Sequence, residues 1–391
     1  MYHIPQIRNA LTTPCSFFPS SPSPSPSPLG SIFRNLQTDA RVTTFELTNS
    51  LNLDPLVQMD AQEFVKLLIT TTEFKEKKKN DKQIHSCPST CNSSPLSFWR
   101  GSIQEYITPT PATKEFPPKL KDSLFYDLSL PIKPSLSSSL LSAYGPSSAE
   151  LLSPQTANAY QPNKNVKLEA LKGERLTRRG LPRVLTLHLK RFTFDWDSET
   201  TSKVNRKVGF GRVLDLEGVG VLDREEEGCQ ESFDSLYKLQ SVVVHKGSFF
   251  GGHYYSYVNL GIGNKSKGGE EWWRFDDEIV ERVEWEDVAI DGFGGSVSVE
   301  EVIEEEKRKS GGDGRLFDYD AGVEERCRLI KSRAGGGKTR RRNVLGRLLD
   351  RVLTSNREGE DAGSYGYGGQ TACAYLLQYV KMDEIDSLYE G

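Results

Sequence analysis

Alternating apolar residues in the middle of the chain place the tightest limit on its fold. In the run Arg183–Phe192, the side chains of Leu185, Leu187 and Leu189 fall on one face of an extended strand. Three further runs of strand character follow, at residues 237–245, 254–260 and 374–380. Strands of this kind must bury at least one face, so the sequence predicts a β-sheet built from the later part of the chain.

The early part of the chain has a helical pattern instead. Between Ser31 and Glu73, apolar residues recur at helical spacing, as Phe64 and Leu67 do. Asp60 precedes this last run and Glu63 lies three positions later, which is the arrangement of a helix N-cap with a capping box. The sequence therefore predicts a mainly helical region ahead of the strands.

Four segments differ from the rest in composition. Residues 19–28 are made only of Pro and Ser, which favours an extended polyproline-type chain that builds no core. The other three are rich in Ser and Pro, or in charge and Gly, with little periodicity. We predict one domain over residues 1–391 that carries flexible insertions at residues 15–30, 78–96, 134–164 and 294–370.

Composition excludes several classes of protein. The 50 Lys and Arg residues are balanced by 54 Asp and Glu residues, which excludes a globally basic nucleic-acid binder. No apolar run approaches the roughly 18 residues that a membrane span needs, and no secretory signal is visible. Six cysteines in 391 residues are too few for a disulfide scaffold. We therefore expect a cytoplasmic and/or nuclear protein with no nucleic-acid or membrane partner.

Two short motifs offer groups for catalysis. The sequence Gly251-Gly252-His253 follows a buried strand, where glycines let a ligand approach closely and permit positive φ, and where the imidazole can face a cleft. Asp276 lies 23 residues after His253, enough for a strand, a loop and a returning strand. It could then accept the Nδ1–H of His253 and fix the tautomer for general-base work. Taken singly, a structural histidine and an Asp-Asp turn are the simpler interpretations.

Together these motifs say more. The stretch 237–277, with Gly-Gly-His-Tyr followed by Trp-x-x-Phe-Asp-Asp, resembles the histidine box of the ubiquitin-specific proteases, papain-like cysteine peptidases that cleave ubiquitin from its conjugates. The resemblance runs from residue 1 to about 382 in family order, and its other boxes are Gln58–Phe64, Lys167–Gly173, Leu181–Phe192 and Ala374–Tyr379.

The resemblance implies an α+β, papain-like fold in which a helical lobe, residues 31–75, packs on a twisted antiparallel sheet with disordered insertions. It implies a thiol-dependent deubiquitinase (ubiquitin C-terminal hydrolase) whose partners are ubiquitin and ubiquitinated proteins, with no cofactor. His253 would be the general base and Asp276 its orienting partner, while Asp277 could assist or simply lie in the turn.

The same resemblance implies a site for the ubiquitin tail. Ubiquitin ends in Gly-Gly, so a narrow channel with glycine walls would exclude other side chains. For Gln62, structural packing is an equal alternative to tail binding. The residues expected to line the channel are Asp60, Gln62, Gly251, Gly252 and Tyr254.

Metal and nucleotide sites are not expected. Many family members hold zinc with four cysteines, but the matching stretches 107–111 and 160–163 contain none. The run His85–Cys91 offers three ligands without a second pair nearby, so we interpret it as a free-thiol loop. The basic cluster Lys338–Arg342 follows a glycine run that resembles a nucleotide-binding loop, but Ser332 stands where its first glycine is required.

The most important departure of this sequence from the family pattern concerns the nucleophile. It lies in a box of the form Asn-x-Cys-aromatic-x-Asn-Ser at a helix start, where the helix dipole lowers the pKa of a thiol. No such string occurs in the chain, and Cys15 is a poor substitute. The first residues resemble sequence that follows the box, so we expect a truncated form of an active enzyme that is itself inactive. The alternative is a catalytically dead ubiquitin-binding or scaffold protein.

Overall fold

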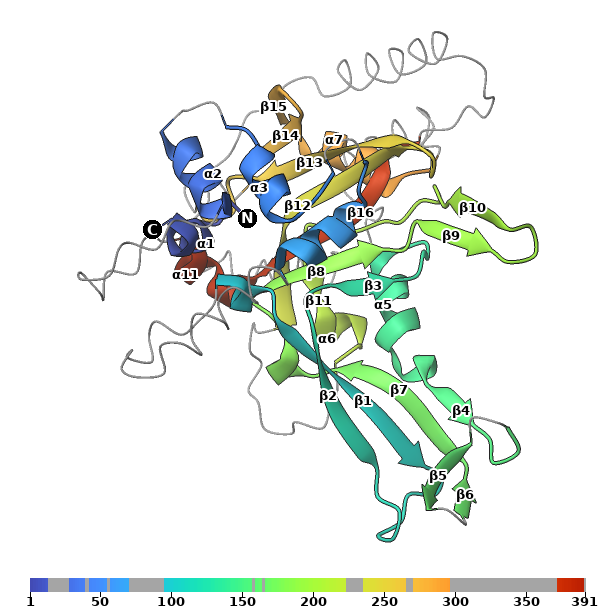
Figure 1. Cartoon of the computed structure of the whole chain (residues 1–391). Coiled ribbons are helices and arrows are strands. Elements are labelled where there is room, and N and C mark those ends of the chain that lie inside the picture. The colour runs from blue at the N-terminus through green and yellow to red at the C-terminus, as the bar shows by residue number, and fades with distance from the viewer. Residues whose placement is uncertain are drawn as a thin grey trace, which may run out of the picture.

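The computed structural model has a group of helices beside a central sheet, from which a second, narrower sheet extends (Figure 1). Within the described residues, no helix is long and apolar enough to span a membrane. Helices and mainly antiparallel sheets within the same chain confirm the predicted α+β class. The structure describes residues 1–12, 28–38, 42–54, 57–69, 95–156, 159–163, 166–222, 235–264, 270–295 and 371–389.

The mainly helical region predicted for residues 31–75 is confirmed as several short helices where the structure describes it. Leu29 and Phe33 of the second helix pack on Leu47 and on Leu68, which lies in the last helix of the region. Apolar side chains at helical spacing thus bury a shared face, which stabilises helices too short to form alone. The helices of this region are α2 (Pro28–Gln37), α3 (Phe45–Ser50) and residues 61–69, and α1 (Pro5–Thr12) precedes them.

The central sheet contains all four strands predicted from the sequence. Neighbouring strands of this sheet are antiparallel, except β3 and β8, which are parallel. The order along the sheet is β15-β14-β13-β12-β16-β8-β3, and β11 pairs with β12. The strands are β3 (Leu128–Leu130), β8 (Val184–Leu189), β11 (Val213–Asp215), β12 (Leu236–Gly247), β13 (Gly252–Asn259), β14 (Trp272–Asp276), β15 (Ile279–Val283) and β16 (Cys373–Lys381).

Strand β8 is buried on both faces, not only on its leucine face. All six of its residues are buried because separate clusters cover its two sides. Leu185, Leu187 and Leu189 belong to the main core, whereas Val184 packs with Ile7 of α1 and its neighbours. The helical lobe therefore lies against one face of the sheet, while α5 (Leu136–Tyr144) and α7 (Trp285–Phe293) contribute to the core on the other.

A second sheet forms the extension seen in Figure 1. It has the order β2-β1-β7-β4, and two hairpins lie outside it. Its strands are β1 (Gly101–Pro109), β2 (Lys119–Phe125), β4 (Glu150–Leu152) and β7 (Ala170–Leu176). The hairpins are β5 (Tyr160–Asn163) with β6 (Val166–Leu168), and β9 (Phe192–Asp195) with β10 (Thr200–Lys203). The short helices are α6 (Leu216–Val219), α11 (Ile385–Tyr389), η2 (Pro95–Phe98), η3 (Pro146–Ser148), η4 (Arg178–Gly180) and η7 (Met382–Glu384).

The insertion predicted at residues 134–164 is wrong where the structure describes it. Ser135 caps α5 by accepting a hydrogen bond from the backbone N–H of Ser138 at 3.0 Å, and Leu136 and Leu140 are buried in the core. The serines here therefore cap and pack a helix rather than form a loop. The end of the 15–30 segment likewise begins α2. Most of the other predicted insertions lie outside the described residues, and the single-domain division stays a prediction.

Candidate functional site

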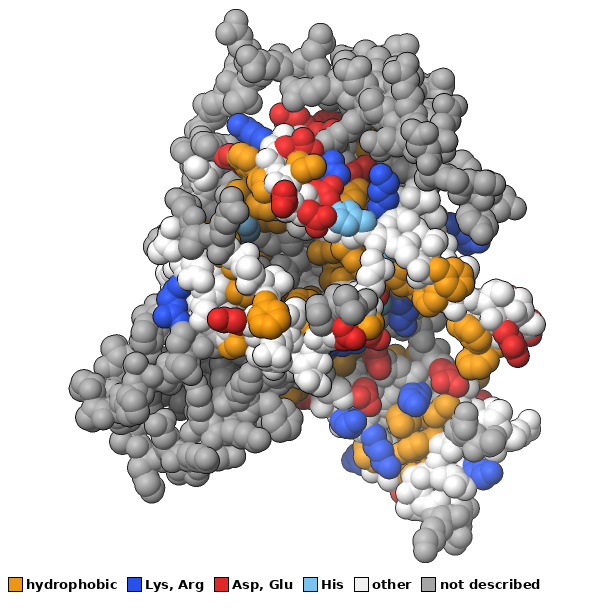
Figure 2. All heavy atoms as spheres, turned by 45° about the horizontal axis from the view of Figure 1, so that its top comes forward, with side chains coloured by type: hydrophobic (Ala, Val, Ile, Leu, Met, Phe, Trp, Pro, Cys, Tyr) orange, Lys and Arg blue, Asp and Glu red, His pale blue; other side chains and the backbone are white. Residues whose placement is uncertain are grey.

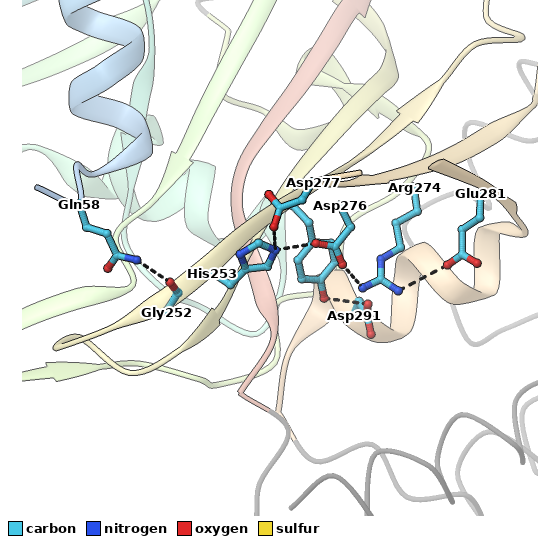
Figure 3. Close-up of polar contacts among 9 residues, drawn as sticks. Gln58, Gly252, His253, Arg274, Asp276, Asp277, Glu281 and Asp291 are labelled. Atoms are coloured by element: carbon cyan, nitrogen blue, oxygen red, sulfur yellow. Dashed lines mark hydrogen bonds and ion pairs between the residues drawn. The ribbon is translucent and has the colours of Figure 1, made fainter. Parts of the chain in front are cut away.

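The hairpin of β13 and β14 brings His253 and Asp276 together (Figure 3). The two strands pair antiparallel, with Tyr257 opposite Arg274, so that His253 lies next to the turn where β14 ends. The His253 Nε2 and Asp276 Oδ1 atoms are 2.5 Å apart. The expected contact between these side chains is confirmed, while the roles assigned to them stay predictions.

Asp276 contacts the Nε2 atom of the His253 ring, whereas the sequence predicted a contact with Nδ1. We predicted that Asp276 accepts from Nδ1–H, but the carboxylate approaches the Nε2 edge of the ring. With Nε2–H donated to Asp276, the tautomer leaves Nδ1 as a proton acceptor. The His253 side chain is 44% exposed, so a group arriving from solution can reach the ring.

Asp276 is held as a carboxylate. Its Oδ2 atom accepts from a guanidinium nitrogen of Arg274, which leaves Oδ1 for His253. Burial acts to raise the pKa of Asp276, but the hydrogen bond from His253 and the charge of Arg274 outweigh it and lower that pKa overall. Asp276 is thus charged at neutral pH and suited to orient an imidazole.

Asp277 lies in the turn after β14. Its backbone adopts φ 50° and its side chain is 79% exposed, with Oδ2 3.8 Å from the Nε2 atom of His253. That distance is too long for a hydrogen bond. The ligand atoms of His253, Asp276 and Asp277 lie within 4.8 Å of one another, as metal ligands would. Because both oxygens of Asp276 already accept hydrogen bonds, the arrangement favours an acid–base pair.

The two glycines before His253 have different surroundings. A Cβ atom on Gly252 would lie 2.3 Å from Nε2 of His245 and 2.6 Å from the carbonyl oxygen of Lys246, whereas Gly251 is exposed with nothing within 4 Å. Gly252 therefore has to be a glycine for β12 and β13 to pack in their hairpin. Gly251, in contrast, faces open space. The positive φ expected in this motif falls instead on Gly247, at +116°.

Asp60 connects the helical lobe to the sheet. Its Oδ1 atom accepts from the backbone N–H groups of Gln62 and Glu63 at 2.8 and 3.1 Å, which confirms the predicted N-cap. Its Oδ2 atom accepts from the hydroxyls of Tyr375 and of Tyr254, the latter at 3.5 Å. The structure thus brings together Asp60 and Tyr254, two of the residues that the family resemblance predicts to line one channel.

The side chain of Gln62 makes its contacts elsewhere. Its Nε2 atom donates to Asp127 Oδ2 at 2.6 Å and to the hydroxyl of Ser129 at 3.3 Å. These contacts join the helix to the start of β3, which favours the packing alternative for Gln62 over contact with a bound tail.

Sequence reasoning passed over two residues of this region. Gln58 donates from Nε2 to the carbonyl oxygen of Gly252 at 3.0 Å (Figure 3), and Tyr375 donates to Asp60. Both stand inside segments that resemble family boxes, which was the signal available. Figure 2 shows histidine and acidic side chains beside a hollow in this face, with hydrophobic side chains lining it.

Cys373 is the one cysteine among the described residues. It is fully buried at the start of β16, opposite His245 of β12, with its sulfur 3.8 Å from Oδ1 of Asn205. A thiol so placed is enclosed in the sheet and cannot meet a substrate. Cys15 and the other cysteines lie outside the described residues.

Comparisons with known proteins give a consistent result. The family model described as ubiquitin carboxyl-terminal hydrolase matches residues 1–308. Ubiquitin C-terminal hydrolase 12 of Arabidopsis thaliana is 30% identical over 305 residues, which cover 75% of this chain and 25% of that protein. Ubiquitin carboxyl-terminal hydrolase 47 of Drosophila melanogaster is 27% identical over 364 residues, which cover 75% of this chain and 22% of that protein. The chain thus spans about a quarter of the length of these relatives.

A solved structure is also similar in part. It is the SAGA Ubp8/Sgf11/Sus1/Sgf73 DUB module bound to ubiquitin aldehyde, one chain of which matches with a TM-score of 0.47 and 22% identity. The match covers 63% of this chain and 50% of that one.

Proposed function

The chain belongs to the ubiquitin carboxyl-terminal hydrolase family, the ubiquitin-specific proteases, and from that premise we propose that it carries the base and the tail-binding wall of a thiol-dependent deubiquitinase. The reaction would remove ubiquitin from protein conjugates. The observation that carries this proposal is the 2.5 Å contact between His253 Nε2 and Asp276 Oδ1, which leaves Nδ1 of an exposed ring open.

This geometry suits a cysteine peptidase. Nδ1 of His253 would take the proton of a thiol, and the thiolate would attack the carbonyl carbon at the end of ubiquitin to form a thioester. The imidazolium would return its proton to the departing lysine amine, and water activated by the same nitrogen would then hydrolyse the thioester. Asp276 would stabilise the imidazolium without taking its proton.

The wall of the ubiquitin-tail channel would be formed by Asp60, Tyr254 and Gly251. Asp60 and Tyr254 are joined through the Asp60 carboxylate, and Gly251 is exposed at the hairpin that presents His253. A Gly-Gly tail passing here would meet no side chain at Gly251. Gly252 supports this wall through packing.

We propose further that residues 1–391 do not hydrolyse ubiquitin conjugates by themselves. The sequence contains no Asn-x-Cys-aromatic-x-Asn-Ser box, and Cys373 is enclosed in the sheet. A base and its orienting partner without a thiolate retain only residual catalysis. The missing box also supports a second function, that of a ubiquitin-binding protein without catalysis.

The test uses the full chain. Ubiquitin binding is measured by calorimetry, and hydrolysis is followed with a fluorogenic ubiquitin substrate, for the wild type and for His253→Ala and Cys15→Ala. Binding without turnover supports ubiquitin recognition without catalysis by this chain. Turnover lost in both variants would make Cys15 the nucleophile and overturn the proposed inactivity. Absence of binding would overturn both functions.

A further inference from the structure

The strands β13, β14 and β15 lie at one edge of the central sheet, and one of their faces carries a continuous row of polar and aromatic side chains. Alternate residues of a strand share a face, and the pairing register aligns Tyr257, Arg274 and Glu281 directly across β13, β14 and β15. The carboxylate of Asp291 in α7 completes the row (Figure 3). Its members are His253, Tyr255 and Tyr257 of β13, Arg274 and Asp276 of β14, Glu281 of β15 and Asp291 of α7.

Arg274 is at the centre of this row. One terminal nitrogen of its guanidinium donates to Oδ2 of Asp276, and the other donates to Glu281 Oε1 at 3.4 Å. The Cζ atom lies 4.7 Å from the centroid of the Tyr255 ring, the position of a cation–π contact. Two carboxylates and one ring therefore restrict the guanidinium from three sides, and only 25% of the side chain is exposed.

The Tyr255 ring that contacts Arg274 is itself held in place. The hydroxyls of Tyr255 and Tyr257 donate to the same oxygen of Asp291, at 2.8 and 2.6 Å. Burial, followed by the charge of Asp291, raises the pKa of both tyrosines, so both hydroxyls keep the protons that they donate. The Tyr255 ring also lies nearly parallel to the His253 ring, with centroids 6.2 Å apart. One anchored ring thus lies beside both Arg274 and the imidazole.

We propose that Arg274 is a positioning residue of the site, which holds Oδ2 of Asp276 so that Oδ1 faces the Nε2 atom of His253. This inference rests on the proposed function and adds a residue to the same site.

The local backbone explains why Asp276 needs such a partner. Asp276 ends β14, and the next residue, Asp277, turns away with a positive φ. The carboxylate can rotate about its Cβ–Cγ bond, which the strand does not restrict. A guanidinium fixes that rotation because its donors have a planar, fixed geometry, whereas a lysine would supply charge without that geometry.

The experiment observes the His253–Asp276 contact in the full chain by NMR, with labelled histidine and aspartate and without ubiquitin. In Arg274→Met, the His253 Nε2 proton should exchange with water about tenfold faster, the factor expected for a weakened charge-assisted hydrogen bond. The lowered pKa of Asp276 should rise toward its ordinary value. In Arg274→Lys, the pKa of Asp276 should stay low while proton exchange still becomes faster.

The matched control is Arg282→Met. Arg282 is exposed on the neighbouring strand and pairs with Trp273, on the opposite face of the sheet from Arg274. It should change neither measurement. As a second check, Arg274→Met added to Asp276→Asn should produce no further change in proton exchange at His253.

Unchanged proton exchange and an unchanged pKa of Asp276 in Arg274→Met would overturn the proposal. If that variant does not fold, unchanged proton exchange in folded Arg274→Lys would overturn it equally. Because no ubiquitin is present, a positive result here can coexist with failed ubiquitin binding, and the two proposals can fail separately.

Discussion

Gln58 and Gly252 are 194 positions apart in the chain, yet the side-chain amide of Gln58 donates to the carbonyl oxygen of Gly252 at 3.0 Å. This hydrogen bond joins the segment leading into the Asp60-capped helix to the hairpin that presents His253. The two parts of the candidate site, the proposed channel wall and the proposed base, are thus joined by this hydrogen bond as well as by the contact of Tyr254 with Asp60.

Removing this contact should loosen the site without unfolding the chain. Gln58→Ala should lower the free energy of unfolding by about 0.5–1.5 kcal/mol, the net contribution of one hydrogen bond. Urea unfolding measures the change. Gln161→Ala, at an exposed position of β5, is the control and should change the free energy by less than about 0.5 kcal/mol. Equal effects in the two variants would show that Gln58 contributes nothing specific.

The two glycines should respond differently to substitution. Gly252→Ala should destabilise the fold by about 1–3 kcal/mol, because its Cβ overlaps the buried His245 ring and the carbonyl of Lys246. Burial, with Lys203 nearby, lowers the pKa of His245 to about 4, so that ring is neutral and closely packed. Gly251→Ala meets open space and should leave stability within about 0.5 kcal/mol of wild type. Chemical denaturation compares the pair.

Gly251 also offers the sharper test of the ubiquitin channel. Gly251→Val should weaken ubiquitin binding at least about tenfold while leaving the fold intact, because its side chain would enter the space proposed for the Gly-Gly tail. Calorimetry gives the affinity, and circular dichroism checks the fold. Wild-type affinity in the folded variant would mean that the tail takes another route.

Asp276 should give stability a defined pH dependence. Its pKa is lowered in the folded chain, so its contribution is fully present above the ordinary carboxyl pKa of about 3.9 and is lost as the pH falls through the lowered value. The wild type should therefore lose stability in acid more steeply than Asp276→Asn. Unfolding free energies measured between about pH 2.5 and 7 compare the slopes, with the exposed Asp277→Asn as the control. Parallel curves for wild type and Asp276→Asn would contradict the prediction.

Gln62 should prove to be a packing residue. Gln62→Glu would place a second carboxylate beside Asp127, where the amide now donates at 2.6 Å, and should cost about 1–3 kcal/mol of stability. Ubiquitin affinity of the folded variant should stay within about twofold of wild type. A large loss of affinity with unchanged stability would restore Gln62 to the tail site.

The sequence predicted what depends on short-range pattern. Leu185, Leu187 and Leu189 revealed β8, and the motifs around His253 and Asp276 predicted a hairpin that the structure contains. The choice of Nε2 over Nδ1 depends on the direction from which Asp276 approaches the ring, and spacing carries no such information.

Other features depend on partners distant in sequence. Gly252 is restricted by the His245 ring across the hairpin, and Gln62 by Asp127. Helix α5 was hidden because its serines, which cap and pack it, have the composition of a loop. Arg274 was not predicted as a site residue, because a lone arginine in a strand is usually exposed. Only the strand register places it between Asp276 and Glu281.

The two contacts of the site, His253 with Asp276 and Tyr375 with Asp60, also differ in the length of the chain segment between their residues. His253 and Asp276 are 23 residues apart within adjacent strands, whereas Tyr375 reaches Asp60 across 315 positions. Closing the longer loop costs more chain entropy, and contacts of high sequence separation form slowly. During folding, the imidazole–carboxylate pair can assemble inside its own hairpin well before the channel wall exists. The proposed recognition of a ubiquitin tail would then be acquired last, when the final strand closes the sheet.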